Sequence, residues 1–205
     1  MKTVAIGDIH GCYTLLKQTI QPLIDTQSEV VFLGDLIDRS PETNGDFKVL
    51  YFVKNLEQNP ADFGLSKVTV LRGNHEQLLL DALDAGKGSH QYELWEYNGG
   101  NAEFYDKAQQ FYDWISDRPY TYIKDKVLFV HAGIRPNVAL EDQDPHDLTW
   151  IRDPFLNAED HGLPYTVVHG HTIVDEVEIH PGRINIDTGA YYSGKLSSIV
   201  IDTPA

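Results

Sequence analysis

Residues 3–10 read Thr-Val-Ala-Ile-Gly-Asp-Ile-His, a short apolar run that ends in a glycine and two polar side chains. The same pattern recurs at residues 30–35, 68–75, 127–133 and 166–171, where an apolar run leads into a cluster of glycine with aspartate, asparagine or histidine. Short runs rich in Val and Ile and bounded by glycine are typical of buried strands. The sequence therefore predicts five such strands, each followed by polar residues.

Helical periodicity separates the early strands. Apolar residues recur at helical spacing over residues 15–24 and 49–56, and another such pattern opens at Asn74 or His75. Alternation of strands and helices predicts a largely parallel sheet.

The apolar runs lie closer together after residue 165. Residues 174–179, 184–186 and 196–201 predict strands joined by turns, which would form a second, more antiparallel sheet. We therefore expect an α/β fold in which two mixed β-sheets form a sandwich flanked by helices.

Residues 86–118 differ from the rest of the chain because aromatic side chains are dense there. The segment predicts a helical insertion with a turn at Asn98-Gly99-Gly100, within a single domain spanning residues 1–205. We expect its aromatic residues to belong to the core; the alternative is a lid or a wall beside the substrate. These residues are Tyr92, Trp95, Tyr97, Phe104, Tyr105, Phe111, Tyr112 and Trp114.

The composition narrows the range of partners. The 205-residue chain carries a formal net charge of -15, whereas nucleic-acid backbones and anionic membrane surfaces bind basic faces. We therefore expect neither nucleic acid nor a membrane as a partner. No segment predicts a membrane span or a signal peptide, and the single cysteine, Cys12, rules out an internal disulfide, so we expect a cytoplasmic protein. The oligomeric state is not indicated.

Six polar residues stand at the ends of successive predicted strands. In parallel α/β sheets, ligands gather at the carboxyl ends of the strands. A single aspartate after glycine is common in turns, but six donors at successive strand ends indicate a shared site. All are oxygen or imidazole donors without a thiolate, a set that suits Mn²⁺, Fe, Zn²⁺ or Co²⁺. They are Asp8, His10, Asp35, Asn74, His131 and His171.

Five motifs together resemble the ordered signature of the calcineurin-like metallophosphoesterases. They are Gly7-Asp8-Ile9-His10-Gly11, Gly34-Asp35-Leu36-Ile37-Asp38-Arg39, Leu71-Arg72-Gly73-Asn74-His75-Glu76, His131-Ala132-Gly133 and Gly170-His171-Thr172. The Gly-Asn-His-Glu motif and the Asp-Arg pair resemble PPP-type protein phosphatases, and residues 95–100 resemble the small bacterial and phage members. Ser40 and Ile173 depart from the pattern, where the family usually has glycine and proline.

The resemblance implies a calcineurin-like sandwich and a centre of two divalent metal ions, in which a metal-bridging hydroxide attacks phosphorus in line. Asp8, His10 and Asp35 would hold one ion. Asp35 would bridge to the second, which would also bind Asn74, His131 and His171. We expect Mn²⁺, with Fe, Zn or Co as alternatives. By motif, His171 rather than His169 is the ligand.

The resemblance also implies roles around the metals. His75 would be the general acid, oriented by Asp38. Arg39, Arg72 and Arg152 would clamp the phosphoryl oxygens. The alternative for Arg152 is a surface ion pair with its acidic neighbours.

The glycine-rich turn at residues 187–196 resembles a turn of bacterial relatives. It would frame the pocket, with Tyr191 or Lys195 near the substrate. A hairpin without a role in binding explains the same residues.

These features favour a phosphomonoesterase that acts on phosphoserine, phosphothreonine or phosphotyrosine in proteins, or on a small phosphomonoester. The main alternative is a symmetrical bis(5'-nucleosyl)-tetraphosphate hydrolase, since those enzymes share Gly-Asp-Ile-His-Gly-Cys and Asp-Thr-Gly. A phosphodiesterase is disfavoured because Ile173 stands where a Gly-His-x-His ending needs histidine. A non-catalytic scaffold is disfavoured because every expected ligand is present.

Overall fold

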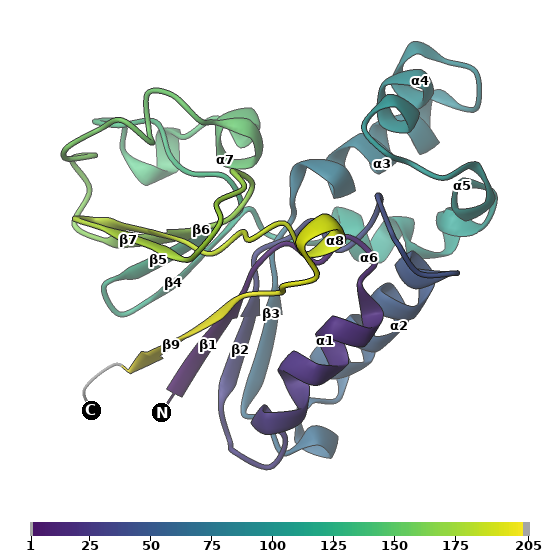
Figure 1. Ribbon diagram of the computed structural model, residues 1–205. Helices are drawn as coiled ribbons and strands as arrows, with labels where there is room; N and C mark the ends of the chain where they lie inside the picture. Colours follow the sequence, from purple (N-terminus) through teal and green to yellow (C-terminus); the bar gives the residue numbers. More distant parts are fainter. Residues whose placement is uncertain (1, 203–205) are drawn as a thin grey trace.

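The computed structural model describes residues 2–202, which form two mixed β-sheets with helices around them (Figure 1). The first sheet has the order β3-β2-β1-β9, with β1, β2 and β3 parallel and β9 antiparallel to β1. Its strands are β1 (Lys2–Ile6), β2 (Glu29–Phe32), β3 (Lys67–Val70) and β9 (Ser198–Asp202). The predicted α/β sandwich is confirmed.

The second sheet has the order β4-β5-β6-β8-β7, in which β5, β6 and β8 are parallel. Strands β4 and β7 run antiparallel to their neighbours at the two edges. The strands are β4 (Thr121–Lys124), β5 (Val127–Val130), β6 (Thr166–His169), β7 (Glu178–His180) and β8 (Arg183–Asn185).

Side chains point alternately to the two faces of each strand, so the hydrophobic core lies in layers on either side of the sheets. Ala5 and Val31 of the first sheet pack with Phe129 and Val168 of the second, so this cluster lies between the sheets. The opposite face of the first sheet, with Phe32, packs under α1 (Tyr13–Ile20) and α2 (Gly45–Gln58), which connect its parallel strands (Figure 1). The outer face of the second sheet packs with α7 (Pro145–Trp150) and neighbouring loops.

The five strands predicted from the early motifs are confirmed to within one residue at each end. The prediction for the end of the chain was partly wrong. Residues 196–201 do not join the second sheet, because β9 pairs with β1 and places Ile199 and Ile201 against the cluster between the sheets. Residues 174–177 form no strand, and β4 was not predicted.

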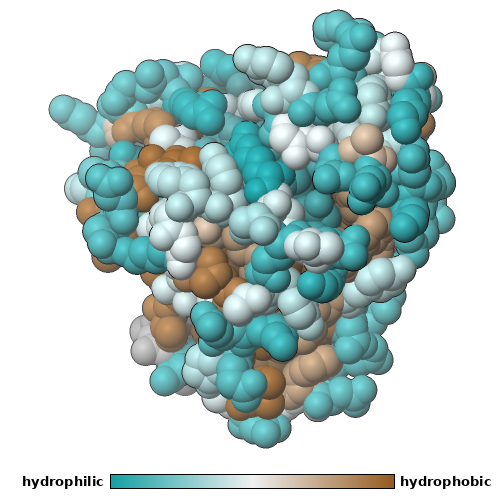
Figure 2. All heavy atoms as spheres, turned by 45° about the vertical axis from the view of Figure 1, so that its right-hand side comes forward, coloured by the Kyte–Doolittle hydropathy of each residue, from teal (hydrophilic) through white to brown (hydrophobic). Residues whose placement is uncertain are grey.

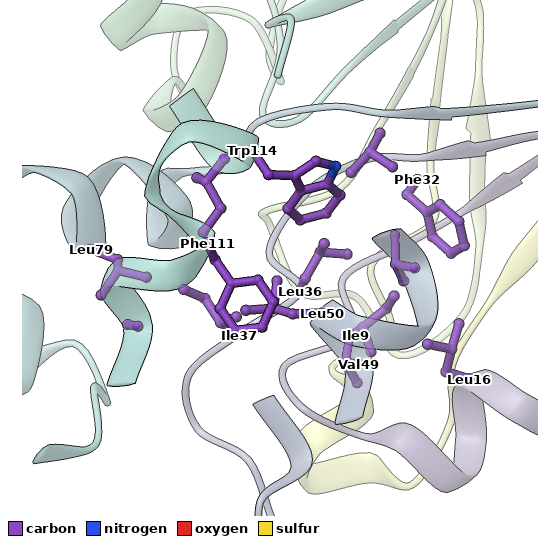
Figure 3. Close-up of a cluster of buried hydrophobic side chains, with 14 of the residues drawn as sticks. Ile9, Leu16, Phe32, Leu36, Ile37, Val49, Leu50, Leu79, Phe111 and Trp114 are labelled. Carbon is purple, nitrogen blue, oxygen red and sulfur yellow. The ribbon is translucent and has the colours of Figure 1, made fainter. Parts of the chain in front are cut away.

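Most of residues 86–118 are helical. They contain α4 (His90–Tyr97), α5 (Ala102–Ala108) and α6 (Tyr112–Ser116), follow α3 (Asn74–Ala85), and turn at residues 98–100. Phe111 and Trp114 belong to the same buried cluster as Leu36 and Leu50, beside the loop after β2 (Figure 3). The expectation that these aromatics belong to the core is confirmed for most of them, but Tyr97 is 89% exposed.

The face in Figure 2 is mostly hydrophilic, and its hydrophobic areas are broken up by polar side chains. Among residues 2–202, no helix combines the length and the apolar character that crossing a membrane requires.

Candidate active site

The six predicted donors converge where the carboxyl ends of the two sheets meet. Asp8 and His10 follow β1, Asp35 follows β2, and Asn74 begins α3 directly after β3. The second sheet contributes His131 after β5 and His171 after β6. All six side chains are buried, with at most 8% of any residue exposed.

Asp35 lies between two groups of donors. Its Oδ2 atom lies 3.6 Å from Nε2 of His10, and its Oδ1 atom lies 3.4 Å from Nε2 of His131. One group of close potential ligand atoms comprises His10, Asp35 and His75, and another comprises Asp35, His131 and His171. Because Asp35 belongs to both groups, its carboxylate has the position of a bridging ligand.

Asn74 completes the second group. Its Oδ1 atom lies 2.8 Å from Nε2 of His131 and 3.0 Å from Nδ1 of His171. An amide oxygen and two imidazole nitrogens therefore point at one another from three separate segments. Such a cluster of neutral and anionic donors fits a divalent ion.

Asp8 offers a test of this fit. Its Oδ2 atom accepts a hydrogen bond from the backbone N–H of His171, but its buried Oδ1 atom has no hydrogen-bond partner. Gly170 permits this close approach, since a Cβ atom there would lie 2.1 Å from Oδ1 of Asp8. An unpartnered buried carboxylate oxygen is costly, and a cation would satisfy it.

The electrostatics of the site suit the binding of a cation. Burial, followed by the charge of Asp187, raises the pKa of Asp8 well above its ordinary value. Burial also raises the pKa of Asp35. Burial lowers the pKa of His131 to about 3 and that of His10 well below its ordinary range. Neutral imidazoles can coordinate a metal, and bound cations would stabilise the ionised carboxylates.

His75 is held by Asp38. The Nδ1 atom of His75 lies 2.8 Å from Oδ2 of Asp38, while its buried Nε2 atom has no partner and lies 3.9 Å from Oδ2 of Asp35. Burial lowers the pKa of His75 to about 4. The resemblance implies an acid and not a metal ligand at His75, yet the structure also places its ring in the donor group of His10 and Asp35. In its neutral form the ring can serve as a further nitrogen ligand, and in its doubly protonated form it can serve as a proton donor held by Asp38.

Two of the three predicted arginines line the cavity at the site, which has a volume of about 440 Å³. The Nε atom of Arg39 donates to the carbonyl of Asn98. Arg152 is exposed at the cavity, and two of its acidic neighbours bond elsewhere: Asp147 pairs with Arg135, and Asp153 accepts from Asn157. Both guanidinium groups are placed to meet an anion.

Arg72 and Lys195 are not among the residues that line this cavity, contrary to expectation. The guanidinium of Arg72 donates to Gln77, to Tyr120 and to the carbonyl of Ser116. The ammonium of Lys195 bonds to the exposed carboxylate of Glu176.

Tyr191 does line the cavity. Its ring lies 5.2 Å from that of His10, and the guanidinium of Arg39 lies over it at 5.4 Å. His169 is buried outside the cavity, with its ring edge-on to Phe155.

The sequence analysis assigned no role to several residues that lie at the site. Asp187 is buried, lines the cavity and raises the pKa of Asp8. It directly follows the apolar run 184–186, so the strand-end rule applied to the other donors could have found it. Asn98 and Trp150 also line the cavity, and no sequence pattern marked them as site residues.

Backbone geometry also marks the site. Ten residues other than glycine have positive φ in the described part of the chain, and half of them belong to the predicted site. These five are His10, Asp35, Asp38, Arg39 and His171, with φ between 46° and 68°. Such left-handed conformations cost about 1–2 kcal/mol per residue and persist only when the surroundings enforce them.

Glu76 supplies part of that enforcement. One oxygen of its carboxylate accepts from the backbone N–H groups of Asp35 and Gly73, and the other accepts from that of Leu36. These bonds fix the loop that carries Asp35 against the start of α3.

Comparisons with known proteins agree with the geometry. A family model described as calcineurin-like phosphoesterase matches residues 1–195. The serine/threonine-protein phosphatase 1 of Salmonella typhimurium is 30% identical over 218 residues, which cover 94% of this chain and 88% of that protein. A symmetrical bis(5'-nucleosyl)-tetraphosphatase of Janthinobacterium is 29% identical, but the match covers 66% of this chain and 45% of that protein.

Among solved structures, the cold-active protein-tyrosine phosphatase of a Shewanella species has a similar fold. The TM-score is 0.68 at 22% identity, over 97% of this chain and 74% of that chain.

Proposed function

The chain belongs to the calcineurin-like phosphoesterase family, and from that premise we propose that it is a two-metal phosphomonoesterase that acts on phosphorylated proteins. The observation that carries the proposal is the position of Asp35, whose two carboxylate oxygens each face a separate group of histidines. A carboxylate shared in this way suits two ions that act on one phosphate.

The proposed ligands follow from the donor groups. Asp8, His10 and Asp35 would hold one ion, and Asp35, Asn74, His131 and His171 the other. We propose Mn²⁺, because oxygen and imidazole donors without thiolate suit it, with Fe, Zn or Co as alternatives. Bound divalent ions would supply an activated water molecule and neutralise charge on the phosphate oxygens.

The side chains around the ligands would bind the substrate and move protons. Arg39 and Arg152 would hold the phosphoryl oxygens at the cavity, where a planar guanidinium can make two parallel hydrogen bonds. In its doubly protonated form, with the Nδ1 proton held by the Asp38 carboxylate, His75 would give the proton on Nε2 to the leaving oxygen and remain as the neutral imidazole. Since Nδ1 is engaged by Asp38, Nε2 is the ring atom left to face the reaction.

The share of each relative that the chain covers favours a phosphoprotein substrate over symmetrical cleavage of a dinucleoside tetraphosphate. The chain covers 88% of a serine/threonine-protein phosphatase but only 45% of a symmetrical tetraphosphatase of similar identity. It also covers 88% of an asymmetrical tetraphosphatase, at the lower identity of 25%. The symmetrical tetraphosphatase reaction is the second candidate, because that match still covers 66% of this chain.

A side-by-side assay with Mn²⁺ tests the proposal. Phosphoserine, phosphothreonine and phosphotyrosine peptides are compared with diadenosine tetraphosphate at equal concentration. Faster turnover of at least one phosphopeptide is expected. Preferential cleavage of the dinucleotide would assign the second function, and no turnover of any of them would overturn both.

A further inference from the structure

Both oxygens of the Asp38 carboxylate are engaged, by partners from different parts of the fold. Oδ2 lies 2.8 Å from Nδ1 of His75, and Oδ1 accepts a hydrogen bond of 3.1 Å from the indole Nε1–H of Trp95. Asp38 and Trp95 are both fully buried. The indole therefore occupies the carboxylate oxygen that His75 leaves free.

Trp95 lies on α4, so the contact comes from the helical insertion. The insertion also holds Arg39, the residue after Asp38. The backbone N–H of Arg39 donates to the carbonyl of Gly99, and its Nε–H donates to the carbonyl of Asn98. Asp38 and Arg39 both have positive φ, 68° and 57°. The insertion thus stabilises two strained residues: Asp38, whose carboxylate would orient His75, and Arg39, which would bind the phosphate.

Packing fixes the direction of the indole N–H. The ring of Trp95 lies against those of Tyr92 and Tyr105, with centroids 5.7 Å and 5.5 Å away. Gly100 lies against the ring, and a Cβ atom there would come within 2.3 Å of it. An indole confined by its neighbours in this way presents its N–H in one direction.

We propose that Trp95 is a positioning residue for proton transfer: its indole N–H fixes the Asp38 carboxylate in the rotamer that orients His75. The inference rests on the proposed function, since it requires that His75 protonates the leaving group. Without the indole donor, Oδ1 of Asp38 would be buried without a partner, and the carboxylate would turn away from His75 to find one. The expected loss is in proton transfer and not in substrate or metal binding.

The test compares aryl phosphates whose leaving groups need a proton to different degrees. Trp95→Phe removes the N–H and keeps an aromatic ring. With Mn²⁺, kcat is expected to fall about tenfold on phenyl phosphate and about twofold on p-nitrophenyl phosphate. The hydrogen bond from Trp95 to Asp38 supports only the protonation of the leaving group, which phenolate needs more than p-nitrophenolate does. KM and bound Mn²⁺ are expected to stay at wild-type values.

Trp114→Phe is the matched control. Trp114 is also a buried tryptophan of the insertion, and its indole N–H also donates to a carboxylate, that of Glu57, at 2.8 Å. This variant is expected to keep the wild-type ratio of the two substrates. An equal loss on both substrates in Trp95→Phe would overturn the positioning role.

A double-mutant cycle separates positioning from general damage. In a His75→Asn background, Trp95→Phe is expected to cause no further loss on phenyl phosphate, since the group that it positions is gone. Additive losses would overturn the inference. Trp95→Tyr is made in parallel, and failure of both variants to fold would assign Trp95 to stability alone. Absence of metal-dependent turnover in the wild type would instead refute the proposed function itself.

Discussion

Asp38 holds the imidazole of His75 by a contact of 2.8 Å between Oδ2 and Nδ1, with both side chains essentially removed from solvent. His75 lines the cavity that Arg39 and Arg152 also line, and its other ring nitrogen has no hydrogen-bond partner. An imidazole fixed at one nitrogen and free at the other has the geometry of a proton donor to a bound substrate.

Replacing His75 is therefore expected to damage catalysis according to the leaving group. General acid catalysis contributes about 10²–10⁴-fold, so His75→Asn should lower kcat by that factor on phenyl phosphate and by clearly less on p-nitrophenyl phosphate. Steady-state kinetics on both esters measures the difference. Wild-type kcat on phenyl phosphate would refute the acid role.

The two arginines from the sequence motifs are expected to differ. Arg39→Lys should raise KM for p-nitrophenyl phosphate about tenfold, since a lysine cannot reproduce bidentate contact with a phosphate. Arg72→Lys should raise KM less and lower the melting temperature more, because the Arg72 guanidinium bonds to Gln77, Tyr120 and Ser116. The opposite order in KM would show that Arg72 turns into the cavity when substrate binds.

Asp46 is expected to make stability depend on pH. Burial, followed by the charge of Asp38, raises the pKa of Asp46 to about 7. A carboxyl whose pKa is higher in the folded state than in the unfolded state binds more protons when folded, so its contribution to stability is lost as the pH rises toward 7. Between pH 5 and 8 this loss is about 2–3 kcal/mol for a shift from 3.8 to about 7.

Asp46→Asn removes that titration and keeps an oxygen for the backbone N–H of Asp38. Urea unfolding of metal-free protein at pH 5 and pH 8 measures the free energy of unfolding of both proteins. The variant should lose less stability than the wild type between the two values. Equal losses would contradict the assigned pKa.

Much of the fold and of the site could be predicted because the same sequence pattern marks both the strands and the polar residues at their ends. Each buried strand of the early motifs ends in a glycine-bearing cluster, so the apolar runs locate the strands and their ends locate Asp8, Asp35, Asn74 and His131. The pattern did not predict β4 or the sheet that β9 joins, because there the apolar run is short or compatible with more than one pairing. The residues of β4 are partly exposed, and the pairing of β9 with β1 depends on which sheet edge is free.

The directions in which individual side chains point could not be predicted from the sequence either. The motif places Arg72 beside Asn74, but hydrogen bonds to residues 116 and 120 draw its guanidinium away from the cavity. Trp95 could be expected in the core, and it is, yet its contact with Asp38 joins residues 57 positions apart. No local pattern reports such a contact, because it depends on how the insertion packs against the loop after β2.

In the proposed site, Asp35 joins two metal ions while His75 binds neither. Equilibrium dialysis of metal-free protein against Mn²⁺, followed by elemental analysis, tests it in wild type, Asp35→Asn and His75→Asn. We expect about two Mn²⁺ per chain in wild type and in His75→Asn, and clearly less than two in Asp35→Asn. One ion or none in the wild type, or a loss of metal in His75→Asn as large as that in Asp35→Asn, would contradict it.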